Sequence, residues 1–149
     1  MNLKRLNILH CDDDTDDCLF FKEALEELNF SAFHGCVNDG DELMRYLMDE
    51  NNELPHILFL DLNMPRKSGF ECLTEIKINE RLRQLTIIIL STSSEPEMLN
   101  TLYKGGAHYY IRKPCDFTKF KKIVKQAFIA LISQENITQP RKENFVLTV

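Results

Sequence analysis

The segment ILFLDLNMP, residues 57–65, decides the fold class. Four apolar residues follow one another and end directly on Asp61. A strand that is apolar at every position is typical of a parallel sheet covered by helices on both faces. A carboxylate is costly to bury without a partner. Asp61 therefore indicates a polar site at the carboxyl end of this strand.

Four other short apolar segments flank this one and predict strands at 6–11, 31–37, 86–90 and 107–112. The amphipathic segments between and after the strands predict helices at 16–30, 40–50, 69–80, 95–106 and 116–133. In the first helix, the periodicity predicts a buried face made of Leu19, Phe20, Ala24, Leu25 and Leu28. Five strand–helix units in succession predict a flavodoxin-like, doubly wound (βα)5 fold with the parallel strand order 2-1-3-4-5.

The composition fits one domain, which we place at 1–134, with an extension at 135–149 that packs on the body or on a partner. The net charge of -5 argues against nucleic acid as a direct partner. No apolar run approaches the roughly 20 residues of a membrane span, and the first residues lack the apolar stretch of a secretory signal. The five cysteines form no CxxC pair and predict reduced thiols in a cytoplasmic protein.

Polar residues follow four of the five predicted strands. The first predicted strand is followed by Asp12 and Asp13, and the third is followed by Asp61. Ser91 follows the fourth strand and Lys113 follows the fifth. Carboxyl ends of parallel strands meet at one edge, and ligands of such sheets bind there. Because strands one and three are neighbours in the expected order, the sequence predicts three carboxylates, a hydroxyl and an ammonium group around one site.

Three adjacent carboxylates favour a small hard cation such as Mg²⁺, which binds oxygen and keeps open positions. One aspartate can then attack phosphorus and form an aspartyl phosphate. The metal and the lysine would neutralise the charge on the phosphoryl oxygens.

The aspartate-rich stretch at 12–17 has other interpretations. As a calcium-binding EF-hand loop it would carry Asp17 where the turn needs glycine. A haloacid-dehalogenase-like phosphatase motif would need an aspartate at position 11, where this chain has Cys11. Asp14, Asp16 and Asp17 fit the solvated start of a helix, where the helix dipole favours negative charge.

Four pieces match a known family in order and in spacing: NILHCDDD, ILFLDLNMPRKSG, IIILSTS and GGAHYYIRKP. Together they make residues 5–133 resemble the receiver domain of two-component response regulators. The details of LDLNMPRKSG and STS resemble most closely the single-domain receivers paired with phytochrome-like kinases. The resemblance implies that Asp61 is the phosphoacceptor. It also implies that Asp12, Asp13, Asp61 and the backbone carbonyl of Asn63 hold Mg²⁺.

The same resemblance assigns the residues that respond to the phosphoryl group. Ser91 would be the switch hydroxyl, Tyr110 the switch aromatic residue, and Lys113 the phosphate partner. In the family a cis proline commonly follows this lysine, here Pro114. Thr92 stands where alanine is frequent, and its larger side chain predicts slow dephosphorylation.

These residues predict a phosphoacceptor switch rather than an enzyme with a substrate of its own. A sensor histidine kinase or a histidine phosphotransfer protein would donate the phosphate, and a downstream protein would receive the signal. No output domain fits in 135–149, so a homodimer through the surface of 95–106, 107–112 and 116–133 is another expected contact. The alternative is a degenerate receiver that binds proteins without phosphorylation.

Overall fold

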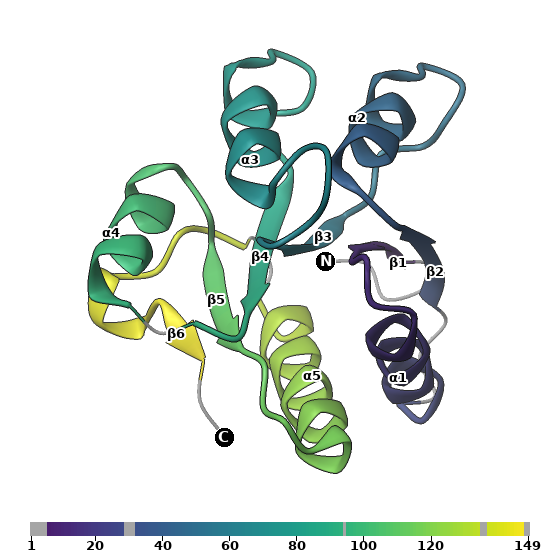
Figure 1. Ribbon diagram of the computed structural model, residues 1–149, viewed down its shortest axis with the longest axis vertical. Helices are drawn as coiled ribbons and strands as arrows, with labels where there is room; N and C mark the ends of the chain where they lie inside the picture. Colours follow the sequence, from purple (N-terminus) through teal and green to yellow (C-terminus); the bar gives the residue numbers. More distant parts are fainter. Residues whose placement is uncertain (1–5, 29–31, 94, 135–136, 148–149) are drawn as a thin grey trace.

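A computed structural model describes residues 6–28, 32–93, 95–134 and 137–147. Its strands are β1 (Leu6–Cys11), β2 (Ala32–Val37), β3 (Ile57–Asp61), β4 (Thr86–Ser91), β5 (Tyr109–Arg112) and β6 (Val146–Leu147). Its α-helices are α1 (Thr15–Glu26), α2 (Gly40–Met48), α3 (Gly69–Ile78), α4 (Pro96–Lys104) and α5 (Phe117–Ile132). All strand pairs are parallel, in the order β2-β1-β3-β4-β5-β6 (Figure 1). The expected fold class and the order of the first five strands are confirmed.

Helices cover both faces of the sheet, as the apolar strands predict. The side chains of β3 alternate between two buried clusters: Leu58 and Leu60 face α2, α3 and α4, whereas Ile57 and Phe59 face α1 and α5. Every residue of β3 is buried. This double cover fixes the strands, and with them the edge at which the polar residues emerge. No helix in the described parts of the chain has the length and apolarity that crossing a membrane requires.

The buried face of α1 differs from the expected one at two positions, because Leu19 lies outside it and Phe21 within it. Leu19 is 52% exposed, whereas Phe21, Ala24 and Leu25 are buried. Residues 21, 24, 25 and 28 follow the i, i+3, i+4, i+7 spacing of one helix face. Leu19 lies outside that stripe, so its assignment to the core was wrong.

A sixth strand, β6, extends the sheet beyond the five that the sequence predicts. Val146 pairs with Tyr110 at the outer edge of β5. Phe145 is 2% exposed and packs against the rings of Tyr103 and Tyr110, at centroid distances of 5.3 and 6.3 Å. Residues 145–147 therefore pack on the body, beside α4 and β5 (Figure 1). Two residues are too few to carry a strand pattern in the sequence.

We expect Phe145→Ala to lower the free energy of unfolding by about 3–5 kcal/mol, because it removes a buried aromatic ring. Urea denaturation followed by circular dichroism measures this change. Val146→Ala, at a half-buried position of β6, is the matched control and should cost about 1 kcal/mol or less. A Phe145→Ala effect no larger than the control's would contradict the packing of this segment.

Candidate metal centre at the carboxyl edge of the sheet

Three carboxylates meet where β1 and β3 end. Asp12, Asp13 and Asp61 each offer an oxygen within 4.8 Å of the others. Asp12 is fully buried and Asp61 is 6% exposed, while Asp13 is exposed to solvent. Oxygen ligands of this kind suit a hard divalent cation, with the solvent side left for water or a ligand. The donor set thus fits a divalent metal, as the sequence predicts.

The sheet register and a close approach of α3 place these groups together. Cys11 pairs with Leu60, so the next residues of β1 and β3 emerge side by side. Behind Asp61 the chain turns back and begins α3 at Gly69, whose N–H donates to the Leu62 carbonyl at 3.0 Å. A Cβ at Gly69 would lie 2.4 Å from the Asp61 carbonyl oxygen. Only glycine allows this approach.

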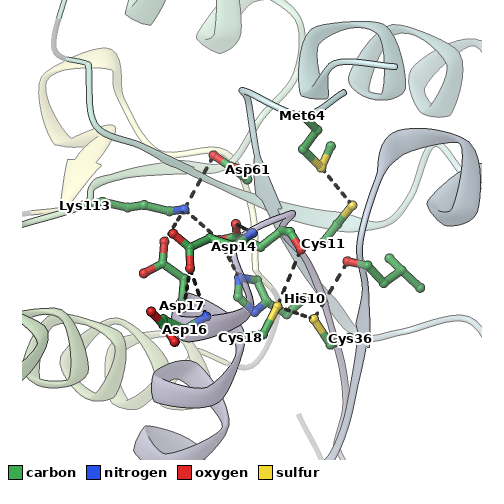
Figure 2. Close-up of polar contacts among 12 residues, drawn as sticks. His10, Cys11, Asp14, Asp16, Asp17, Cys18, Cys36, Asp61, Met64 and Lys113 are labelled. Carbon is green, nitrogen blue, oxygen red and sulfur yellow. Dashed lines mark hydrogen bonds and ion pairs between the residues drawn. The ribbon is translucent and has the colours of Figure 1, made fainter. Parts of the chain in front are cut away.

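Lys113 reaches into the cluster from the end of β5. Its Nζ lies 2.6 Å from Asp12, 3.0 Å from Asp17 and 3.6 Å from Asp61 (Figure 2). Burial lowers the pKa of Lys113, but the neighbouring carboxylates outweigh it and raise the pKa above its usual value. The lysine therefore stays charged at the position where the sequence expects it.

Asp17 is a member of the site that the sequence interpretation missed. We expected it only to start α1, but its half-buried carboxylate pairs with Lys113. Asp14 does cap the helix, because its side chain accepts hydrogen bonds from the backbone N–H groups of Asp16 and Asp17. No sequence pattern marks Asp17, because its partner Lys113 comes from the end of β5, far along the chain. The strand before this stretch and the helix from Thr15 exclude the EF-hand loop.

The two buried aspartates respond to the shared charge in opposite ways. Burial raises the pKa of Asp12, but hydrogen bonding with His10 and the ion pair with Lys113 outweigh it and lower the pKa to about 2. Burial raises the pKa of Asp61 to about 7, and the nearby charges of Asp12 and Asp13 add to this rise. The positive charge of Lys113 lowers the pKa but does not outweigh burial. The protein thus holds more negative charge here than Lys113 neutralises. A divalent cation would remove this imbalance.

The two expected switch residues lie on the next two strands of the sheet, Ser91 on β4 and Tyr110 on β5. Ser91 ends β4 with 1% exposure, and its Oγ accepts a hydrogen bond from the Ser93 N–H at 3.2 Å. Tyr110, on β5, is fully buried, and its hydroxyl donates to the Ser93 carbonyl. The loop after β4 therefore links the two side chains. Lys113 N–H also donates to the Ser91 carbonyl at 2.7 Å, which ties β5 to the same point.

The remaining expected positions are more exposed. Asn63 lies in the loop after β3, where its backbone N–H hydrogen-bonds the Asp61 carboxylate. Thr92 is exposed directly after Ser91. The expectation of a cis proline after Lys113 is wrong, because the peptide bond before Pro114 is trans.

Comparison with known proteins agrees with this geometry. Residues 8–125 match the family model of the response regulator receiver domain. The chain is 30% identical over 122 residues to the probable methanogenesis regulatory protein FilR2 of Methanothrix harundinacea. The aligned region covers 80% of this chain and 79% of that protein.

Solved structures of receivers have the same fold. The Mn²⁺-bound form of response regulator Rcp1, a protein known from Synechocystis, superposes with a TM-score of 0.80 at 28% identity, over 91% of this chain and 99% of that one. The phosphorylated cyanobacterial phytochrome response regulator RcpA superposes with a TM-score of 0.82 at 31% identity, over 87% of this chain and 95% of that one. With a family match over most of its length and the acidic edge in place, the chain belongs to the response regulator receiver family of two-component signalling.

Proposed function

We propose that Asp61 accepts a phosphoryl group and that Asp12, Asp13, Asp61 and the Asn63 carbonyl hold Mg²⁺ during the transfer. One observation carries the proposal: Asp61 is buried in a three-carboxylate cluster with Lys113 Nζ 3.6 Å away. Such a carboxylate has both a site for a cation and a fixed positive charge beside its reactive oxygen. The metal-bound and phosphorylated relatives support the same assignment.

In the transfer, a carboxylate oxygen of Asp61 attacks phosphorus while the bond from phosphorus to the donor breaks. A phosphohistidine of a sensor kinase or phosphotransfer protein is the donor, and its released imidazole nitrogen takes up a proton. The Lys113 ammonium group exchanges its contacts with carboxylates for contacts with the new phosphoryl oxygens and keeps its positive charge. Mg²⁺, when bound, offsets the remaining phosphoryl charge.

The phosphoryl group would then act on the loop after β4. The Ser91 side chain rotates to donate a hydrogen bond to a phosphoryl oxygen, and this rotation breaks the hydrogen bond that its Oγ accepts from the Ser93 N–H. Tyr110 follows, because its hydroxyl holds the same loop through the Ser93 carbonyl. The result is a shift between two populated arrangements, limited by the contacts that the phosphoryl group makes in each.

The output of this switch is a protein contact. We assign 1–134 to the receiver and 135–149 to an extension, in a cytoplasmic protein with no reaction beyond its own phosphorylation and dephosphorylation. The surface of α4, β5 and α5 is the proposed contact for a downstream protein or a second copy. On this surface β6 covers the outer edge of β5, so contacts would use the helices and β6 rather than a free strand edge.

We expect Thr92→Ala to shorten the lifetime of the phosphorylated protein by about 2–10-fold, since a smaller side chain beside Ser91 admits water more readily to the phosphoryl group. The decay of the phosphorylated fraction, followed by intact mass after removal of the donor, gives the lifetime. Thr118→Ala, at the start of α5, is a threonine control that should leave it unchanged. Equal lifetimes for Thr92→Ala and the wild type would disprove this role.

The proposed function is tested by incubating the protein with a small-molecule phosphodonor, such as acetyl phosphate, and Mg²⁺. We expect a gain in intact mass of one phosphoryl group, absent with EDTA and absent in Asp61→Asn. If no donor, including a histidine kinase, produces an adduct on folded protein, the phosphorylation-independent binding module is the correct alternative.

A further inference from the structure

We propose that Cys18 and Cys36 form a reversible disulfide through exchange with a low-molecular-weight disulfide such as oxidised glutathione. Cys18 lies in the second turn of α1 and Cys36 in β2. Their Sγ atoms are 2.7 Å apart (Figure 2). Non-bonded heavy atoms are normally about 3.5–4.0 Å apart, and a disulfide needs about 2.05 Å. The pair is thus already held closer than ordinary contact, and a small side-chain rotation would allow the bond.

The fold brings these two thiols together and keeps the other cysteines apart. In the β1–β2 register His10 lies opposite Cys36, and α1 lies beside this pair with Cys18 directed towards Cys36 (Figure 2). Cys11 is buried and directed to the Asp39 carbonyl and Met64 sulfur, while buried Cys72 is directed to the Gly40 carbonyl. Cys115 is exposed beyond β5. Cys18 and Cys36 are both partly exposed, so a small reagent can reach them.

The exchange has two steps. The Cys36 sulfur, as thiolate, attacks one sulfur of the small disulfide, and the released thiolate takes the proton that Cys36 lost. Cys18 then attacks the Cys36 sulfur of this mixed disulfide and expels the second small thiol. The protein loses two protons and two electrons, and the reagent takes them up to become two thiols. The hydrogen bond from Cys18 lowers the pKa of the Cys36 thiol, which favours Cys36 as the first nucleophile.

A soft metal ion is a different use of the same atoms, because His10, Cys18 and Cys36 each offer a ligand atom within 4.8 Å of the others. Two sulfurs bound tetrahedrally to zinc, at about 2.3 Å each, lie about 3.8 Å apart. The observed 2.7 Å is about 1 Å shorter and fits a disulfide better. Besides its interaction with Cys18, His10 has two other partners: its Nε2 lies 3.3 Å from Asp12 and its ring stacks on Phe21.

The disulfide would fasten α1 to β2 beside the metal centre. The Cys18 thiol lies 3.5 Å from the Asp12 carbonyl, and Asp17, next in the chain, pairs with Lys113. Oxidation removes the proton of the Cys18 thiol, so its sulfur can no longer donate a hydrogen bond to the Asp12 carbonyl. A reversible bond is also the kind of disulfide that occurs in reducing compartments, where such bonds are transient or redox-sensing.

The test treats the full-length protein with oxidised glutathione in EDTA, then denatures and alkylates it. We expect three alkylated cysteines instead of the five of the reduced protein. One linked peptide pair should contain Cys18 and Cys36, and dithiothreitol should restore full alkylation. Cys36→Ser should abolish the link, whereas Cys115→Ser should keep it.

Two results would overturn the proposal. Full alkylation after oxidation, or links that join other cysteines, would show that the pair does not exchange as a unit. Binding of Zn²⁺ alone to the wild type, lost in Cys36→Ser and without a Cys18–Cys36 link under oxidation, would identify a metal site instead. Because the main result is read from the wild type, a folding defect in a variant would not obscure it.

Discussion

Replacing Asp61 by asparagine is expected to raise the free energy of unfolding of the metal-free protein by about 2–4 kcal/mol at pH 8. Burial raises the pKa of Asp61 to about 7, far above that of an unfolded aspartate. At pH 8 the carboxylate is charged in both states, and its charge is unfavourable only in the fold. Asparagine has nearly the same shape and no charge, so it removes this cost.

The same pKa gives the pH dependence and its sign. Between about pH 4 and pH 7 the folded protein binds a proton at Asp61 that the unfolded chain does not. The contribution of Asp61 therefore stabilises the wild type as pH falls through this window, and Asp61→Asn should lose that contribution. Urea denaturation in EDTA at several pH values measures both effects.

Asp16→Asn is the matched control, because Asp16 is an exposed aspartate of the same acidic stretch. It should change stability by about 0.5 kcal/mol or less. Addition of Mg²⁺ should stabilise the wild type and Asp16→Asn, but Asp61→Asn much less, since binding to the folded state alone shifts the equilibrium. An Asp61→Asn variant less stable than the wild type in EDTA would contradict the charge imbalance.

Replacing Asp13 by asparagine is expected to weaken Mg²⁺ binding by at least about 100-fold, because it removes one of the three proposed charged ligands. Asp13 is the exposed member of the cluster, so its loss leaves no buried group without a partner. The effect can thus be assigned to the metal rather than to folding. Isothermal titration calorimetry measures the affinity directly.

Asp16→Asn serves again as the control and should bind Mg²⁺ like the wild type. The rate of phosphoryl uptake at low Mg²⁺ should fall with the affinity in Asp13→Asn and recover at high Mg²⁺. Unchanged affinity in Asp13→Asn would place the cation elsewhere than at the end of β1.

The sequence predicts those strands that are continuous apolar segments. β3 and β4 are buried at every position, and a strand of this kind fits only in the interior of a sheet that is covered on both faces. Because parallel strands end at one edge, the positions of Asp12, Asp61 and Lys113 along the chain were enough to predict that they meet. Distances of 2.6 and 3.6 Å from Lys113 to the two aspartates agree with that prediction.

What the sequence did not predict depends on contacts between distant segments. Asp17 looks like any acidic residue in a first helical turn, and only the arrival of Lys113 from β5 gives it a partner. β6 is too short to show periodicity, and the packing of Phe145 against Tyr103 and Tyr110 decides its place. Leu19 is apolar like Phe20 and Phe21, but it lies outside the stripe of α1 that packs on the sheet, so it is exposed.

The most direct test of the central claim is to locate the phosphoryl group. After phosphorylation with Mg²⁺, borohydride reduction converts an aspartyl phosphate to homoserine, and tandem mass spectrometry of the peptides identifies the converted residue. We expect homoserine at position 61 alone, with none in the EDTA sample. Conversion at Asp12, Asp13 or another aspartate, or a stable phosphate on a different kind of residue, would contradict the assignment of Asp61 as the phosphoacceptor.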